Sequence, residues 1–190
     1  METRGESYYI HRVRNGDRDA YAWLVDRYKD MVYTLCIRML GNEMDADEAA
    51  QDVFVKAYRS IGSFQEKSKF STWLYRIAYN HCISVIRRKV KVIDLVDEIP
   101  EEHEGNEEMG GMELLSAQER SKYLRQAIDS LPETDAVVVT LFYYEELSLE
   151  EIAGVTGLTN NNIRIKLHRS RKKLYRELQK MLNSEVSSIM

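Results

Sequence analysis

Apolar residues recur at helical spacing along most of the chain, and few residues interrupt the pattern. Only two prolines and nine glycines occur among 190 residues, and no stretch alternates apolar and polar residues for long. Apolar positions three and four residues apart line one face of an α-helix, whereas a half-buried strand requires strict alternation. The sequence therefore predicts an all-α fold.

Charge divides the chain into three parts. The formal net charge is −4, but residues 1–90 carry net +3, residues 91–120 net −8 and residues 121–190 net +1. The acidic middle part also contains a proline and three glycines, a composition that disfavours a packed core. We predict two small helical domains, one at residues 1–92 and one at residues 119–190. A flexible acidic linker, residues 93–118, connects them.

The composition gives little support to membrane, secreted or catalytic classes. No run of about 18 apolar residues indicates a membrane span, and the first residues lack the apolar core of a signal peptide. Cys36 and Cys82 lie in apolar helical patterns, so we expect buried, reduced thiols in a cytoplasmic protein. The four histidines are far apart in sequence. We predict no catalytic residue, metal, cofactor or small-molecule substrate.

Glycines and polar residues mark the helix boundaries of the N-terminal part. Asn15-Gly16 ends a first short helix, and a second runs from about Arg18 to Leu40, where Gly41-Asn42 stops it. We expect the next helix to start at Asp45, with Glu48 completing a capping box.

The helix after Asp45 has two unlike faces. Its core face is expected to hold Ala46, Ala50, Val53, Phe54, Ala57 and Ile61. The opposite face shows Asp47, Glu48, Gln51, Asp52, Val55 and Arg59. An acidic face is most often only solvated, but a valine among polar groups favours a protein contact. The spacing leaves both interpretations open.

The segment from Phe64 to Lys89 is rich in aromatic and basic residues. Ser71 is placed to cap a helix that runs to about Lys89. One arc of this helix is apolar and expected to face a core: Leu74, Ala78, Cys82, Val85 and Ile86. A second arc mixes an aromatic ring, cations and an amide: Trp73, Arg76, Ile77, Asn80, Ser84 and Arg87.

This second arc suits single-stranded nucleic acid, whose bases stack on rings and whose phosphates attract cations. Aromatic-rich helices are more often part of a core, so the pattern alone does not decide. The loop Gln65–Lys69, between Phe64 and Phe70, is placed to close over an extruded base.

A short helix, a glycine turn and a strongly basic helix follow one another near the C-terminus. Ser148 and Glu151 form a capping box, Gly157 supplies a left-handed turn, and Thr159 caps the second helix. This order is typical of a helix-turn-helix, whose second helix enters the major groove of DNA. A scaffold helix precedes the unit, with Pro132 expected in its first turn.

The basic helix is expected to present one apolar and one DNA-facing side. The apolar side packs on Ile152, Ala153 and Leu158 with Ile163, Leu167, Ser170 and Leu174. Residues near the start of a recognition helix reach base edges, and later cations hold phosphates. The expected base readers are Asn161, Arg164, Ile165 and His168, and the expected phosphate contacts are Lys166, Arg169, Arg171 and Lys172.

Three segments resemble the extracytoplasmic-function (group 4) sigma factors of the sigma-70 family. They are Asp45–Phe54, Phe70–Asn80, and the stretch from Ser148–Ala153 to Arg171–Leu174. The resemblance covers nearly all of residues 8–182. It implies a sigma region 2 helical bundle and a sigma region 4 helix-turn-helix, in a chain that binds core RNA polymerase and directs promoter-specific initiation.

The resemblance also implies three interfaces. The acidic face would dock on the polymerase clamp helices through Asp47, Glu48, Gln51, Asp52 and Val55. The aromatic segment would melt the −10 element, with a flipped base held by Phe64, Ile77 and Asn80. Its full set of expected DNA contacts is Phe64, Lys67, Lys69, Trp73, Arg76, Ile77, Asn80, Arg87 and Arg88.

The basic helix would then read the −35 element, and the acidic linker would thread toward the polymerase active site. The family usually has an anti-sigma factor, often at the inner membrane, so we expect such a partner.

Two other classes remain as alternatives to this prediction. A stand-alone helix-turn-helix activator with a helical sensor domain would bind promoters without polymerase, and it would lack the Trp73–Asn80 arc. A purely protein-binding adaptor would leave the basic helix unexplained.

Overall fold

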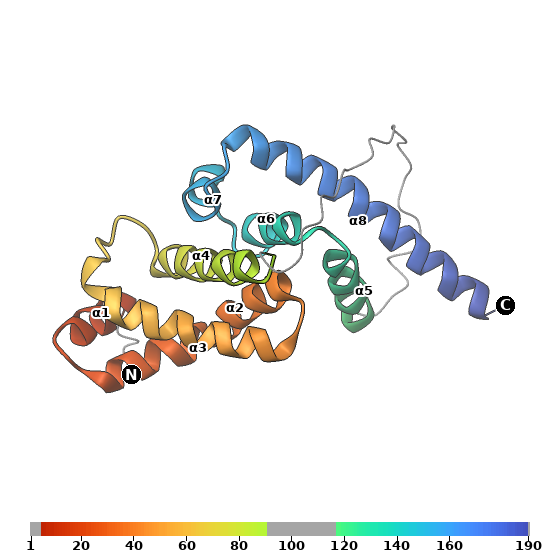
Figure 1. The fold of residues 1–190 in the computed structure, drawn as a ribbon. Helices are drawn as coiled ribbons and strands as arrows, with labels where there is room; N and C mark the ends of the chain where they lie inside the picture. The colour runs from red at the N-terminus through yellow and green to blue at the C-terminus, as the bar shows by residue number, and fades with distance from the viewer. Residues whose placement is uncertain (1–4, 91–116, 190) are drawn as a thin grey trace.

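The computed structural model describes residues 5–90 and 117–189. Over these residues it contains eight α-helices, one 3-10 turn and no strand (Figure 1), which confirms the all-α prediction. Most of the predicted linker, residues 93–118, lies outside the described residues. The N-terminal elements are α1 Glu6–Arg14, α2 Arg18–Leu40, α3 Glu43–Ser60, η1 Ile61–Ser63 and α4 Phe70–Val90. The C-terminal elements are α5 Ala117–Asp129, α6 Glu133–Tyr143, α7 Leu149–Thr156 and α8 Asn160–Ile189.

The ends of α2 agree with the boundaries expected from the sequence. Asp17 is its N-cap, and the side chain accepts a hydrogen bond of 3.1 Å from the backbone N–H of Ala20. Gly41 is its C-cap in a left-handed conformation with φ 73°, which a residue without a Cβ adopts at little cost. Short-range side-chain chemistry is therefore sufficient to predict this helix.

The predicted start of α3 is wrong. The helix begins at Glu43, and its N-cap is Asn42, whose side chain accepts a 2.8 Å hydrogen bond from the N–H of Asp45. Asn42 has extended backbone angles and a short side-chain acceptor, the two properties of a good cap. Asp45 thus lies in the first turn and not before it.

The starts of α4 and α6 also differ from the prediction. Ser71 lies inside α4, because the carbonyl of Lys69 already accepts the N–H of Trp73 at 3.2 Å. Pro132 is the N-cap of α6 and lies outside its first turn, with ψ 143°. Its carbonyl accepts the N–H groups of Asp135 and Ala136 at 2.8 and 2.9 Å, so the backbone carbonyl helps to start this helix.

The N-terminal domain is a bundle in which α2 packs against α1, α3 and α4. The predicted core arcs are largely confirmed, because the following members are buried: Ala46, Val53, Ala57, Ile61, Leu74, Ala78 and Cys82. The remaining members are only half-buried, namely Ala50, Phe54, Val85 and Ile86, and Ala49 is buried although it was not predicted. Each fully buried valine or leucine stabilises the bundle by about 1.5–3 kcal/mol.

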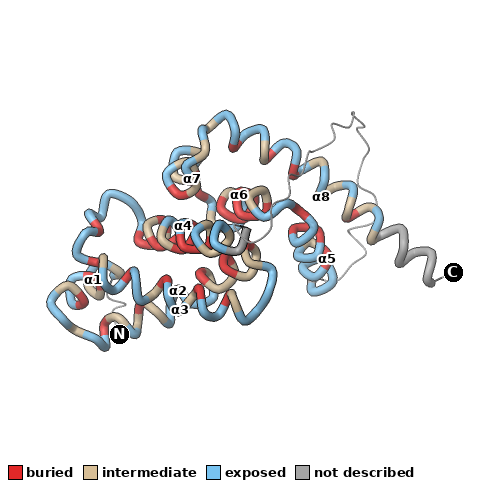
Figure 2. The backbone as a smooth tube through the Cα atoms, viewed as in Figure 1, coloured by how far each residue is buried: buried red, intermediate tan, exposed pale blue. Residues whose placement is uncertain are grey.

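In the C-terminal domain, α8 packs along α5, α6 and α7. Helix α6 is surrounded on all sides: the six consecutive residues Ala136–Leu141 are all buried, as the red tube in Figure 2 shows. A helix buried all round needs neighbours on every face. The C-terminal domain does not supply all of them.

The N-terminal domain supplies the rest, because the two domains pack against each other. Helix α2 contacts α6, and α4 contacts α7, within one continuous buried cluster (Figure 1). The Arg38 guanidinium donates to the Thr140 hydroxyl, and its Cζ lies 5.7 Å from the centre of the Tyr144 ring. Tyr75 is 2% exposed; burial, followed by a hydrogen bond with Glu145, raises its pKa. A cavity of about 680 Å³ lies at the same junction, with both Arg38 and Arg125 among its lining residues.

Candidate polymerase and nucleic-acid interfaces

The acidic face of α3 is accessible. All five residues predicted for polymerase binding are exposed: Asp47, Glu48, Gln51, Asp52 and Val55. Val55 is 46% exposed. An exposed apolar side chain gains free energy when a partner covers it, and the surrounding carboxylates add charge selectivity.

An apolar groove borders this face, and the sequence analysis missed it. The groove has a volume of about 390 Å³ and is lined by Arg18, Tyr21, Phe54, Val55 and Tyr58. The Tyr21 hydroxyl donates to the Phe54 carbonyl, and burial raises the Tyr21 pKa. Val55 and Tyr58 could have predicted the groove from the sequence, because residues three apart are neighbours on one side of a helix.

Beneath the acidic face lies His81 of α4, which is 5% exposed. Its Nδ1 contacts Lys56 Nζ, and its Nε2 lies 3.6 Å from Asp52 Oδ2. Burial, followed by the charge of Lys56, lowers the His81 pKa. The neutral His81 ring therefore accepts a hydrogen bond from the ammonium group of Lys56 and directs its Nε2 toward Asp52. These two contacts connect α4 to α3.

Three aromatic rings form the base of the loop Gln65–Lys69. The ring centres of Phe64, Phe70 and Trp73 lie 5.2–5.5 Å apart in all three pairs. Phe64 is only 4% exposed, so this predicted contact of a flipped base lies inside the cluster, whereas Trp73 is half-buried at its edge. Such rings attract one another through tilted and edge-to-face packing.

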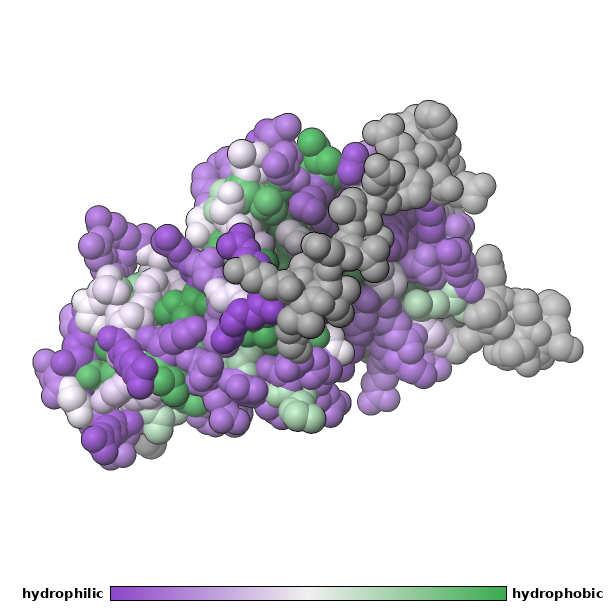
Figure 3. All heavy atoms as spheres, viewed as in Figure 1, coloured by the Kyte–Doolittle hydropathy of each residue, from purple (hydrophilic) through white to green (hydrophobic). Residues whose placement is uncertain are grey.

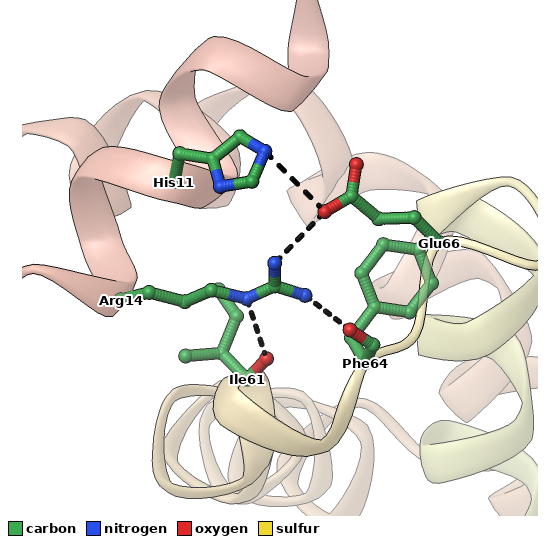
Figure 4. A network of polar contacts seen from close by, with 5 residues as sticks. All are labelled: His11, Arg14, Ile61, Phe64 and Glu66. Atoms are coloured by element: carbon green, nitrogen blue, oxygen red, sulfur yellow. Dashed lines mark hydrogen bonds and ion pairs between the residues drawn. The ribbon is translucent and has the colours of Figure 1, made fainter.

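A network from α1 holds the same loop (Figure 4). The guanidinium of Arg14 donates to Glu66 Oε1 at 2.8 Å, to the Ile61 carbonyl at 3.4 Å and to the Phe64 carbonyl. His11 Nε2 lies 3.6 Å from the same Glu66 oxygen. Glu66 has φ 56°, a left-handed conformation that costs a non-glycine residue about 1–2 kcal/mol. The sequence did not predict this network, because its partners are up to 52 residues apart.

The arc of α4 that is predicted to face DNA is largely open to solvent. Arg76, Asn80, Ser84 and Arg87 are exposed, and Trp73 and Ile77 are half-buried. The remaining predicted cations, Lys67, Lys69 and Arg88, are exposed as well. The structure therefore brings an aromatic edge, an amide and several cations to one side of the N-terminal domain.

A second buried arc of α4 was not predicted. Tyr75 and Tyr79 are 2% and 7% exposed, and Tyr75 forms a hydrogen bond with Glu145 of the C-terminal domain. Two successive tyrosines four residues apart were a usable signal, because residues at that spacing share one helix face.

The C-terminal helix pair has the geometry expected of a helix-turn-helix. Ser148 and Glu151 form the predicted capping box, with a 3.2 Å bond from the Glu151 N–H to the Ser148 hydroxyl. Gly157 is left-handed with φ 76°, and the Thr159 hydroxyl accepts the N–H of Asn162 at 3.2 Å. The side-chain amide of Asn160 also donates a 3.1 Å hydrogen bond to Glu150 Oε1.

Helix α8 separates its apolar and polar sides as predicted. Ile163, Leu167 and Ser170 are buried, and Leu174 is half-buried. The predicted base readers are all exposed: Asn161, Arg164, Ile165 and His168. Of the predicted phosphate contacts, Arg169 and Arg171 are exposed, Lys172 is half-buried, and Lys166 forms a 2.5 Å ion pair with Asp135 of α6.

The visible surface is mainly hydrophilic, with hydrophobic side chains in separate patches (Figure 3). Within the described parts of the chain, no three histidine, cysteine, aspartate or glutamate side chains are grouped to hold a metal ion. Among those same residues, no helix has the length and apolar character to span a membrane.

The two domains match two different family models. Residues 24–92 match sigma-70 region 2, and residues 121–174 match sigma-70 region 4. Solved structures resemble the chain across both domains. The sigma factor RpoE of Bartonella quintana, solved with the anti-sigma factor NepR, overlays with a TM-score of 0.63 over 84% of this chain and 96% of RpoE, at 18% identity. CnrH, solved with the cytosolic domain of CnrY, overlays with a TM-score of 0.60 over 91% and 96%, at 22% identity.

Sequence relatives match over almost their full length. The chain is 38% identical to the ECF RNA polymerase sigma factor SigW of Bacillus subtilis strain 168, over 90% of this chain and 95% of SigW. It is 33% identical to the ECF RNA polymerase sigma-E factor of Escherichia coli strain K12, over 91% and 94%. The chain therefore belongs to the ECF RNA polymerase sigma factors.

Proposed function

We propose that this sigma factor binds core RNA polymerase through α3, reads the −35 element with α8 and opens the −10 element with α4 and its preceding loop. The polymerase supplies the chemistry of RNA synthesis, and the sigma factor has no catalytic role of its own. The observation that supports the proposal is that one chain exposes two separate surfaces with cationic and amide side chains, one on α4 and one on α8.

For the −35 element, the start of α8 enters the major groove. Arg164 and Asn161 have the donors and acceptors that grip guanine and adenine edges, each worth about 1–3 kcal/mol of discrimination. Arg169 and Arg171 neutralise phosphates and hold the register. Gly157 ends α7 and Thr159 caps α8, so the turn between the two helices is formed before DNA arrives.

For the −10 element, the exposed arc of α4 receives one separated strand. Arg76 and Arg87 lie along the phosphates, and Asn80 bonds the edge of an extruded base. Trp73 offers its edge for stacking, which is worth about 1–3 kcal/mol per base. Phe64 and Phe70 support Trp73 from the buried side, and Arg14 holds the loop above them.

For the polymerase, α3 offers acidic side chains beside Val55 and the groove at Tyr58. Residues 93–118 are proposed to enter the polymerase toward its active site. The chain is proposed to act in the cytoplasm, where an anti-sigma factor covers its DNA-binding surfaces and holds it near the inner membrane until a signal arrives.

Transcription from a promoter library tests this proposal. Core polymerase is incubated with the library in the presence or absence of the chain, and the initiated transcripts are sequenced. We expect initiation at a restricted set of promoters only when the chain is present. Tight, sequence-specific binding of the same promoters by the chain alone, with no gain in initiation, supports instead a stand-alone activator.

A further inference from the structure

The two cysteines of the chain meet in the core of the N-terminal domain. Cys36 of α2 and Cys82 of α4 are 46 residues apart in sequence, yet their Sγ atoms lie 3.7 Å from each other. Both residues are 0% exposed and both are free thiols. The burial predicted from the sequence is confirmed, but the contact between the sulfurs was not predicted.

The surroundings of the two sulfurs are unequal. The hydrogen bond between them raises the pKa of Cys36 and lowers the pKa of Cys82. Burial opposes this shift of the Cys82 pKa, and the positive charge of Lys56 adds to it; Lys56 is exposed while it contacts the neighbouring His81. The thiolate is the reactive form of cysteine, and a second thiol within contact is placed to resolve its oxidation product.

We propose that Cys36 and Cys82 are a peroxide-responsive pair that forms an intrachain disulfide across α2 and α4. The Cys82 thiolate attacks hydrogen peroxide and becomes a sulfenic acid, releasing hydroxide. The Cys36 sulfur then attacks the sulfenic sulfur, loses its proton and displaces water. In sum, two thiols give up two electrons to one peroxide, and one disulfide and two waters result.

Burial selects the oxidant and the product. Both sulfurs are buried, so an oxidant reaches them only through local opening of the bundle, which admits peroxide more readily than a glutathione-sized thiol or a second chain. Oxidation therefore links Cys36 to Cys82 and not to another thiol. A disulfide has an S–S distance of about 2 Å, so the sulfurs approach each other by a side-chain rotation of modest size.

The bond encloses α3 and the loop Gln65–Lys69, because both lie between the two cysteines in sequence. A cross-link across such a long loop restricts the unfolded chain and raises thermal stability by roughly 10 °C in a domain of this size. The oxidised N-terminal domain is thus a more stable form of the bundle that contains α4. The chemistry of the pair is independent of the proposed promoter function.

The experiment treats the full chain with hydrogen peroxide, alkylates it under denaturing conditions and measures its intact mass. We expect a mass loss of two hydrogens, no alkylation, a linked Cys36–Cys82 peptide, a raised melting temperature and reversal by a dithiol. Two alkylated thiols, oxidation to sulfinic acid in place of the disulfide, or cross-linked dimers would overturn the proposal.

Three variants assign the roles of the residues. Cys36→Ser and Cys36→Ala should leave Cys82 as a sulfenic or sulfinic acid, because no resolving thiol remains. Lys56→Gln should slow disulfide formation several-fold, and the matched control Lys67→Gln, in the exposed loop, should not. Oxidation of Cys82 at the same rate in the Lys56 and Lys67 variants contradicts the role of the cation, and an unreactive Cys82 in both Cys36 variants contradicts the mechanism.

Discussion

At the scale of single residues, α8 is proposed to make two kinds of DNA contact, which mutation should separate. Arg164→Ala removes a guanidinium near the helix start, so discrimination between −35 sequences should fall by about 1–3 kcal/mol. Arg169→Ala, which removes an exposed cation further along the helix, should weaken binding of all sequences alike and lower the salt slope by about 1. Holoenzyme binding to −35 variants at several salt concentrations measures both effects. An equal loss on every sequence for Arg164→Ala contradicts its assignment as a base reader.

The buried His81 makes stability depend on pH. Its pKa is lower in the folded chain than its ordinary value of 6.5, because burial and Lys56 oppose the charged ring. The unfolded chain therefore binds a proton that the folded chain rejects, and stability falls as pH decreases below about 6.5, by at most about 1.4 kcal/mol per pH unit. Urea unfolding at pH 7.5 and pH 5.5 measures this loss. His81→Gln should reduce the pH dependence, and an unchanged dependence would exclude His81 as its source.

At the scale of elements, short-range signals predicted some helix ends and not others. Gly41, Ser148 and Gly157 act within their own turn, so the sequence predicted their roles. The start of α3 was misassigned because Asn42 and Asp45 are both good caps, and only the backbone angles choose between them. Local pattern alone therefore locates a helix more reliably than its first residue.

The loop before α4 shows what local pattern cannot predict. Its aromatic base was visible as a cluster of rings in sequence, but the clamp from Arg14 joins residues 47 to 52 positions apart. A contact of that range depends on how α1 packs against the bundle, which periodicity does not specify.

Removing the clamp should loosen the loop and weaken promoter opening. Arg14→Ala deletes hydrogen bonds to Ile61, Phe64 and Glu66, and we expect a stability loss of about 1–3 kcal/mol together with reduced selectivity at the −10 element. Thermal unfolding and transcription from −10 variants measure the two effects. Lys29→Ala is the matched control, since its exposed ion pair with Asp26 contributes little. Wild-type selectivity in the Arg14 variant would show that the Arg14 hydrogen bonds do not contribute to recognition of the −10 element.

At the scale of the whole molecule, packing between the domains is the largest feature that the sequence analysis missed. The buried run Ala136–Leu141 and the pair Tyr75 and Tyr79 both carried the signal. The run Ala136–Leu141 was assigned to a scaffold helix of its own domain, because a pattern indicates that a face is buried without indicating its partner. Tyr75 and Tyr79 belonged to neither predicted arc of α4. The two domain cores were otherwise predicted well.

Loss of Arg38 should loosen the contact between the domains. Its guanidinium is half-buried between Thr140 and Tyr144, so Arg38→Ala leaves the Thr140 hydroxyl without this donor and opens space at the junction. We expect a larger radius of gyration in solution scattering, whereas Arg59→Ala, an exposed arginine of α3, should leave it unchanged. Identical scattering from the Arg38 variant and the wild type would show that other contacts hold the domains together.

We propose that, within one chain, α8 recognises the −35 element and α4 opens the −10 element. The most direct measurement is permanganate reactivity of unpaired thymines on a linear promoter, with core polymerase and wild-type chain or Asn80→Ala. With polymerase and wild-type chain, we predict reactive thymines in the −10 element. With polymerase and Asn80→Ala, we predict that the −35 element is still protected but that few −10 thymines react. Wild-type promoter opening with Asn80→Ala, or opening by polymerase without the chain, would contradict the proposed role of α4.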